Sequence, residues 1–118
     1  METVQASSIF EALSSEVRLD LFRLLVKSAP DGLVAGEIAK TLQVPGTNLS
    51  FHLKGLLHSG LINVEKEGRF LRYRANIPLM LDTIAYLTSE CCANQPEQCR
   101  RYRAQSAVSP AVLPGWND

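Results

Sequence analysis

The sequence predicts a mostly α-helical domain that carries one small β-hairpin. Apolar residues recur with the helical period of about 3.6 through residues 1–60 and again from residue 78. Over residues 62–75, apolar and polar residues alternate instead with a period of two, which is typical of strands. At 118 residues, the chain is large enough to bury one hydrophobic core, so we expect a single domain.

Three helices are expected in the first part of the chain. The first covers about residues 1–13, and the second follows an N-cap at Ser15 and runs to about Ser28. Residues 30–32, Pro-Asp-Gly, then break the helical pattern. The third helix covers about residues 34–42, with small residues on one face that let a neighbouring helix pack closely.

The stretch from residue 45 to residue 60 predicts a fourth helix with two different faces. Its apolar stripe is formed by Leu49, Leu53, Leu56 and Leu57, and Gly60 follows where a left-handed cap is expected. The rest of its circumference carries short or cationic polar groups and no acid. Such groups suit a DNA major groove, where hydrogen bonds read the base edges. The expected DNA contacts are Thr47, Asn48, Ser50, His52 and Lys54.

The third and fourth helices are separated by only a few residues, which is the helix-turn-helix arrangement. The alternating segment then predicts a hairpin that turns at Gly68 and Arg69. Arg69 lies at its tip, and Arg72 and Arg74 share one face, so we expect a wing that contacts phosphates or the minor groove. The alternative is a hairpin that merely closes the core. With the wing, the predicted fold is a winged helix-turn-helix.

The charge distribution supports a nucleic-acid partner. The formal net charge is zero, but residues 45–76 carry +3, whereas residues 1–44 carry −2 and residues 77–118 carry −1. A local basic patch is the footprint expected of a DNA-binding surface. No apolar run approaches the roughly 18 residues of a membrane span, and nothing at the start indicates export. We therefore expect a cytoplasmic protein with no membrane partner, whose three cysteines are thiols.

A last helix is expected over residues 78–92, where Pro78 lies in the first turn. It has more apolar surface than one small core needs, so a two-fold homodimer interface is expected there. We place the DNA-binding and dimerisation domain at residues 1–92. Residues 93–118 lose the periodicity and read as a loosely ordered tail carrying Cys99, with the last dozen residues disordered.

The order of these elements and three stretches of sequence resemble the ArsR/SmtB family of metalloregulatory repressors. The stretches are LSSEVRLDLFRLL (residues 13–25), LSFHLKGLLHSGLI (49–62) and EGRFLRYR (67–74). The match covers roughly residues 6–92. It implies a winged helix-turn-helix homodimer that binds a palindromic operator in double-stranded DNA and leaves it when an inducer binds.

Two of the sensor sites of this family do not transfer to the chain. Many arsenic-responsive members have a Cys-x-Cys pair on the third helix, where this chain has Val34 and Gly36. Zinc sensors use Asp and His pairs on the last helix, and here Asp82 is present but no histidine follows His58. The chain instead resembles an atypical arsenite-responsive subclass with three cysteines at the end of the last helix. In this chain they are Cys91, Cys92 and Cys99.

Three thiolates with no histidine or carboxylate nearby suit trivalent arsenic or antimony, because soft ions select sulfur ligands. Zinc usually takes four ligands. We therefore expect a transcriptional repressor that is released from DNA by arsenic(III) or antimony(III) and needs no organic cofactor. Whether Cys99 binds within its own chain or across the dimer stays open, as does the preference between inorganic and methylated arsenic.

Several alternatives remain at this point. Cys99 next to Arg100 could be a redox-sensitive thiol, the chain could sense zinc or cadmium, or the cysteines could be structural. A DNA-binding dimer without any ligand is a further alternative. An enzyme is not expected, because the sequence has no Cys-x-x-Cys motif and its only two histidines lie on one predicted helix.

Overall fold

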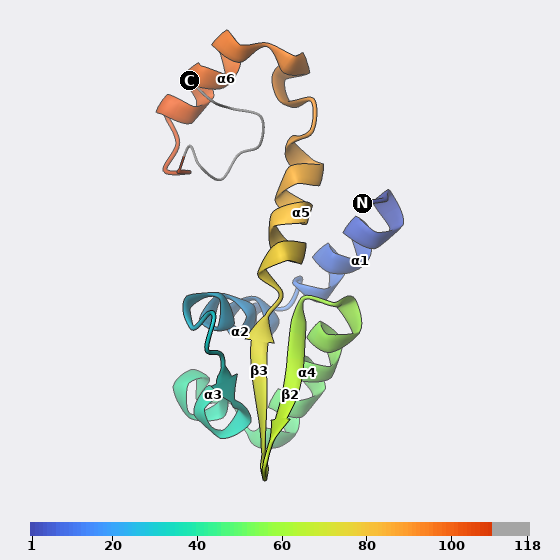
Figure 1. Ribbon diagram of the computed structural model, residues 1–118, viewed down its shortest axis with the longest axis vertical. Coiled ribbons are helices and arrows are strands. Elements are labelled where there is room, and N and C mark those ends of the chain that lie inside the picture. Colours follow the sequence, from blue (N-terminus) through green and yellow to red (C-terminus); the bar gives the residue numbers. More distant parts are fainter. Residues whose placement is uncertain (110–118) are drawn as a thin grey trace.

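The computed structural model describes residues 1–109 and confirms the predicted winged helix-turn-helix (Figure 1). In these residues, the elements follow in the order α1 (Thr3–Ala12), α2 (Glu16–Lys27), β1 (Leu33–Val34), α3 (Ala35–Leu42), α4 (Gly46–Ser59), β2 (Ile62–Glu67), β3 (Phe70–Ala75), α5 (Ile77–Thr88), the 3₁₀ helix η1 (Cys91–Asn94) and α6 (Pro96–Ala104). Helices α1 to α4 and the sheet form a body, and α5 leads away from it to η1 and α6.

The core of the body is built around one face of α4. The predicted stripe is buried at Leu49, Leu53 and Leu56, and it packs against buried side chains of α2, α3 and β2. The fully buried partners are Ile9 of α1, Leu61 just before β2, and Leu21, Leu25, Ile38 and Ile62. Each buried aliphatic side chain of this size contributes roughly 1.5–3 kcal/mol relative to leaving it in water. The opposite face of α4 is therefore turned toward solvent.

Hydrogen bonds fix the ends of the helices that frame this core. The Ser15 hydroxyl accepts a hydrogen bond from the backbone N–H of Arg18, so the predicted N-cap of α2 is confirmed. Gly60 adopts the expected left-handed conformation after α4, with φ of 85°. The Asn76 side chain caps α5 at Leu79 and also donates to the Gly60 carbonyl at 2.9 Å. The start of α5 is thus tied to the end of α4.

The sheet has one strand more than the predicted hairpin. Strand β1 pairs antiparallel with β3, so the strand order is β1-β3-β2. A two-residue strand is too short to show a period in the sequence, which is why it was not predicted. Gly32 precedes β1 with φ of +73°, and a Cβ there would lie 2.3 Å from the Tyr73 carbonyl oxygen. Only glycine fits this close approach of β1 to β3.

The C-terminal part differs from the prediction. Helix α5 ends at Thr88, four residues before the predicted end, because the backbone turns left-handed at Glu90. Helix α6 lies within the segment expected to be a loosely ordered tail. Pro96 in its first turn, Glu97 near its N-terminus and basic residues in its last turn stabilise it. The expected disorder of the last dozen residues falls mainly on residues 110–118, which lie outside the described part.

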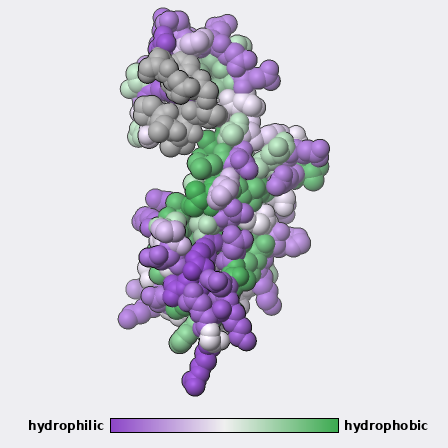
Figure 2. All heavy atoms as spheres, viewed as in Figure 1, coloured by the Kyte–Doolittle hydropathy of each residue, from purple (hydrophilic) through white to green (hydrophobic). Residues whose placement is uncertain are grey.

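Apolar side chains gather on the part of the molecule where α5 leaves the body (Figure 2). Leu81 and Leu87 of α5 are exposed, as are Val4 and Phe10 of α1. The two helices are joined by a 2.7 Å hydrogen bond between the hydroxyls of Thr3 and Tyr86. Among the helices of residues 1–109, none has both the length and the apolar character needed to cross a membrane.

Replacing Gly32 by alanine tests the close approach of β1 to β3. We expect Gly32→Ala to lower the free energy of unfolding by at least about 2 kcal/mol, because the new Cβ meets the Tyr73 carbonyl and the left-handed backbone disfavours alanine. Gly36→Ala is the matched control, since a Cβ there meets nothing within 4 Å and lies on α3. It should be neutral or stabilising by up to about 1 kcal/mol. Urea unfolding followed by circular dichroism measures both, and equal effects would contradict the packing described.

Candidate DNA-binding surface and thiol site

The solvent-facing side of α4 carries most of the side chains predicted to contact DNA. Four of them are exposed: Thr47, Asn48, Ser50 and Lys54. His52 is half-buried against α2, where its Nδ1 accepts a 3.1 Å hydrogen bond from Nε of Arg18. Burial, followed by the nearby charge of Arg18, lowers the pKa of His52. His52 is therefore neutral at pH 7 and carries its proton on Nε2, which is left as a donor.

Two residues of this surface were not singled out from the sequence. Phe51 is 65% exposed in the middle of α4, and the Arg18 guanidinium lies 5.3 Å from the centroid of its ring. The same guanidinium passes over Gly55, whose missing side chain makes room for it. The helical period alone places Phe51 on the polar face, so the sequence held that signal. Arg18 could not be found this way, because its partners lie on another helix.

On the wing, the three predicted arginines lie in different surroundings. Arg69 is exposed in the turn between β2 and β3. Arg72 pairs with Glu67 at 2.8 Å and donates to the Gly32 carbonyl, and Arg74 pairs with Glu65 at 2.6 Å. The acids of β2 thus offset much of the positive charge of β3.

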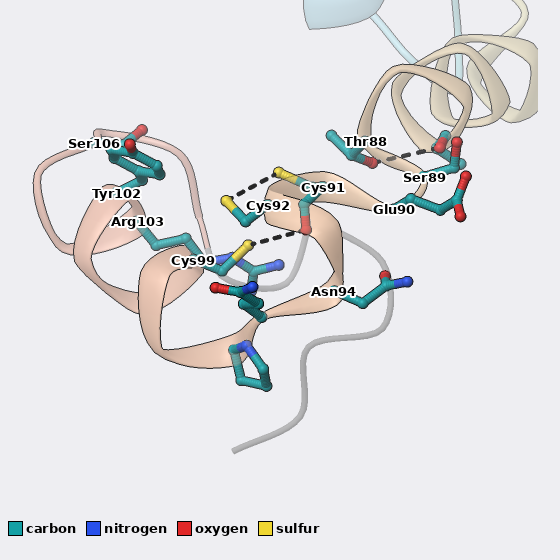
Figure 3. Close-up of a pocket in the computed structure, with 13 residues that line it drawn as sticks. Thr88, Ser89, Glu90, Cys91, Cys92, Asn94, Cys99, Tyr102, Arg103 and Ser106 are labelled. Atoms are coloured by element: carbon teal, nitrogen blue, oxygen red, sulfur yellow. Dashed lines mark hydrogen bonds between the residues drawn. The ribbon is translucent and has the colours of Figure 1, made fainter.

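The three cysteines lie together beyond the end of α5 (Figure 3). Their sulfur atoms are all within 4.8 Å of one another, and those of Cys91 and Cys92 are 3.7 Å apart. Adjacent side chains on a regular helix point about 100° apart. Here Cys92 and Ala93 are left-handed, with φ of 55° and 52°, so the chain turns and both sulfurs face the same side. Helix α6 then returns the buried Cys99 to the cluster.

Contacts within the cluster keep its middle member protonated. Hydrogen bonding to Cys99, then burial, then contact with Cys91 raise the pKa of Cys92 to about 11. At neutral pH, Cys92 is therefore a thiol and not a thiolate. Because the thiolate is the nucleophile that attacks an oxidant, a protonated Cys92 reacts slowly with oxidants.

The cluster opens into a cavity of about 570 Å³ formed by the end of α5, η1 and α6. Thr88, Gln95, Tyr102 and Arg103 contribute to its walls. Glu90 also lines the cavity, but its carboxylate points away from the three sulfurs (Figure 3). In the described part of the chain, the three cysteines are the group of side chains that could hold a metal ion. The site therefore offers three sulfur atoms that could coordinate an ion, next to a cavity large enough for that ion to enter.

A winged helix-turn-helix whose fourth helix exposes a polar face defines a class of protein, the DNA-binding transcription regulators. Comparisons with known proteins agree with this class. A helix-turn-helix domain model matches residues 13–65. A solved ArsR-like transcriptional regulator from Rhodococcus sp. RHA1 is 31% identical with a TM-score of 0.65, and the match covers 90% of this chain and 95% of that one. The chain belongs to the ArsR-like family of transcriptional regulators.

Two further relatives bear on the fold and on the length of the match. The uncharacterized HTH-type transcriptional regulator YceK of Bacillus subtilis strain 168 is 36% identical over 63 residues, which is 53% of this chain and 62% of its own length. The homodimeric winged helix-turn-helix DNA-binding domain Mb0332 of Mycobacterium bovis is 21% identical with a TM-score of 0.58. That match covers 77% of this chain and 84% of the other, and it shows the same fold.

The protonation state of the cluster can be tested by alkylation. Because the pKa of Cys92 is raised to about 11, its reaction with iodoacetamide should stay slow at pH 8 and accelerate only as the pH rises toward that value. Cys99→Ala removes the largest cause of the shift, so Cys92 should then react faster at pH 8. Peptide mapping by mass spectrometry follows Cys92 in both proteins. Protein unfolded in guanidinium chloride is the reference, and equal rates in folded and unfolded protein would contradict the shift.

Proposed function

We propose that this regulator is a repressor that binds operator DNA as a homodimer and is released by arsenic(III), or by antimony(III), at its three cysteines. The observation that carries the proposal is the meeting of three sulfurs within 4.8 Å of one another. Around a three-coordinate centre with metal–thiolate bonds of about 2.3 Å, the sulfurs lie at most about 4.0 Å from one another. The sulfurs of Cys91 and Cys92, 3.7 Å apart, already meet this limit. A closure of roughly 1 Å would bring all three sulfurs onto one ion.

The chemistry of arsenous acid suits a thiol that is still protonated, as Cys92 is. Three As–O bonds break and three As–S bonds form, and each leaving hydroxide takes one thiol proton and departs as water. Arsenic stays trivalent, and no net proton is released. The raised pKa of Cys92 is therefore no obstacle to this exchange. A divalent zinc ion would have to displace the thiol protons into solution, so its binding is opposed at neutral pH.

The number of ligands also favours a three-coordinate ion over zinc. Structural zinc sites take four ligands of the Cys and His type, whereas the described residues supply three sulfurs here. Soft trivalent ions select sulfur. All three sulfurs come from one chain, which supports a site within each subunit and two sites in the dimer. Oxidation of the cluster is a weaker alternative because a protonated Cys92 is a poor nucleophile.

Dimerisation is supported by the exposed apolar side chains on α1 and α5. Val4 is 81% exposed and Leu87 is 60% exposed, and both lie on helices that leave one side uncovered. A second copy that covers these helices about a two-fold axis would remove this surface from water. The dimer would then present two copies of α4 to two half-sites of a palindrome.

In the proposed complex, α4 enters the major groove. The exposed side chains of Thr47, Asn48, Ser50 and Lys54, with the Nε2 donor of His52, would contact bases and phosphates. The wing arginines would contact phosphates or the minor groove, and they would contribute unequally to the binding free energy. Arg69 is free of ion pairs in the described residues, whereas Arg72 and Arg74 would first have to give up their glutamate partners.

A physical connection exists between the thiol site and α4. Helix α5 ends beside the cysteines, and its first residues are tied to α4 through the Asn76 side chain and the Gly60 carbonyl. Tyr86 near the C-terminal end of α5 contacts α1, which packs on α4. Ligand binding that moves the end of α5 would therefore alter the spacing of the two α4 helices in a dimer. Coupling of about 1–3 kcal/mol would weaken DNA binding roughly 5–150-fold.

Release of DNA by arsenite is the direct test. A labelled duplex selected by the protein from a random pool is followed by fluorescence anisotropy under reducing conditions. We expect arsenite to weaken binding by the roughly 5–150-fold given above, and we expect the response to be lost in Cys91→Ser, Cys92→Ser and Cys99→Ser. Ser106→Ala changes the wall of the same cavity without removing a sulfur, so it should respond like wild type.

Competition between ligands sharpens this test. Arsenite affinity should be nearly constant between about pH 6 and pH 8, because the exchange releases no proton. Zinc affinity should rise over the same range, because binding displaces protons from thiols. Release by zinc, cadmium or peroxide while arsenite has no effect would overturn the arsenic proposal and leave the family assignment in place.

The unequal weight of the wing arginines predicts different salt dependences. Arg69→Ala should make the slope of log K against log salt shallower by about 0.9, the value of one phosphate contact. Arg72→Ala should change the slope by less than half as much, because its guanidinium is engaged by Glu67 and the Gly32 carbonyl. Titrations at several salt concentrations measure both variants. A larger effect of Arg72→Ala would reverse the ranking.

A further inference from the structure

Phe51 lies on the side of α4 that faces away from the core. At 3.6 residues per turn, position 51 is nearly opposite the buried stripe of Leu49, Leu53 and Leu56. Its neighbours on that face are Thr47 and Lys54, at the spacings of four and three residues that bring helical side chains together. The ring of Phe51 is 65% exposed in the middle of this face, so the described fold leaves most of its apolar surface in contact with water.

The ring is nevertheless held in place from one side. The Arg18 guanidinium lies 5.3 Å from its centroid, and Arg18 is itself fixed by its hydrogen bond to His52. The His52 ring meets Phe51 edge to face, with centroids 5.5 Å apart and planes at 68°. Gly55 leaves the space for this arrangement, because a Cβ there would lie 2.6 Å from the Arg18 Cζ. Phe51 is thus oriented before any partner arrives, which lowers the entropy cost of binding.

The surroundings of the ring indicate its partner. Helix α4 has no acidic residue, and the groups beside Phe51 are donors: the Arg18 guanidinium, the Nε2 of His52 and the Lys54 ammonium. An apolar ring among hydrogen-bond donors matches an edge that offers a methyl group next to acceptors. In the DNA major groove, thymine has this edge, with its C5-methyl beside the O4 acceptor.

We propose that Phe51 reads thymine through contact with its methyl group, and that Arg18 is a positioning residue for Phe51. The inference rests on the proposed DNA binding by α4 and specifies which base that surface selects. Phe51 adds apolar readout to a helix whose other outward side chains are polar. Arg18 acts from α2, on the edge of the contact surface.

Replacing thymidine by deoxyuridine removes only the methyl group and so tests the contact. On a duplex selected by wild-type protein from a random pool, deoxyuridine at the thymines facing α4 should weaken binding about fourfold for each methyl buried, or about 0.8 kcal/mol. Phe51→Ala should bind the two duplexes equally well. Phe70→Ala is the matched control, because Phe70 is 62% exposed but lies on the wing, so it should keep the thymine preference.

The outcomes separate this inference from the function on which it rests. If the wild type selects no duplex, DNA binding and thymine reading both fail. If it binds DNA but its selected site lacks thymine, the uracil duplex binds equally well, or Phe51→Ala retains the thymine preference, the role of Phe51 is overturned while DNA binding stands. Circular dichroism of Phe51→Ala should match the wild type, since the side chain is exposed.

Two substitutions of Arg18 distinguish positioning from a phosphate contact. Arg18→Lys keeps the charge but loses the planar guanidinium and the Nε donor to His52. If Arg18 positions Phe51, both Arg18→Lys and Arg18→Met should reduce the fourfold thymine preference toward onefold. If Arg18 only contacts phosphate, Arg18→Met should make the salt slope shallower by about 0.9 while both variants keep the preference, which would overturn the positioning role.

Discussion

Burial of one face of α4 is the constraint on which the rest of the structure depends. Leu49, Leu53 and Leu56 are at most 3% exposed, and together they join α2, α3 and the sheet into one core. Side chains radiate around the helix axis, so packing this face against the core directs the opposite face of α4 toward solvent. The rigidity of the proposed DNA-contact surface and the stability of the fold therefore come from the same three leucines. Asn76 extends this constraint to α5 through the Gly60 carbonyl.

The thiol site depends on the opposite condition, a departure from regular helix. A continued α5 would separate Cys91 and Cys92 by about 100° around its axis. The left-handed residues Glu90, Cys92 and Ala93 remove that separation at a cost in backbone energy, since such conformations are unfavourable away from glycine. A ligand bonded to all three sulfurs would offset this cost. Under the proposed function, ligand binding would therefore be linked to the conformation that follows α5, as a sensor requires.

The elements with long residue patterns could be predicted from the sequence, and so could the three cysteines that form the candidate site. The leucine stripe of α4, the cap at Ser15, the turn at Gly60 and the hairpin were all readable from spacing. Strand β1 was missed because two residues hold no period, and α6 because its mainly polar sequence has no apolar stripe. The clustering geometry of the three sulfurs could not be predicted from the sequence, because it depends on the left-handed backbone at Glu90, Cys92 and Ala93. The contact of Arg18 with His52 required tertiary structure, because the two residues are 34 positions apart.

The neutral net charge of the chain bears on how such a surface can discriminate DNA sequences. On the wing, Glu65 and Glu67 are paired with Arg74 and Arg72, so a large part of the local positive charge is already offset. A weak phosphate term lowers affinity for all sequences alike. In the proposed complex, discrimination would then come from the groups on α4 that would face base edges, where donors and an apolar ring lie side by side. A regulator with little excess charge gains more from one well-held aromatic contact than a strongly basic one would.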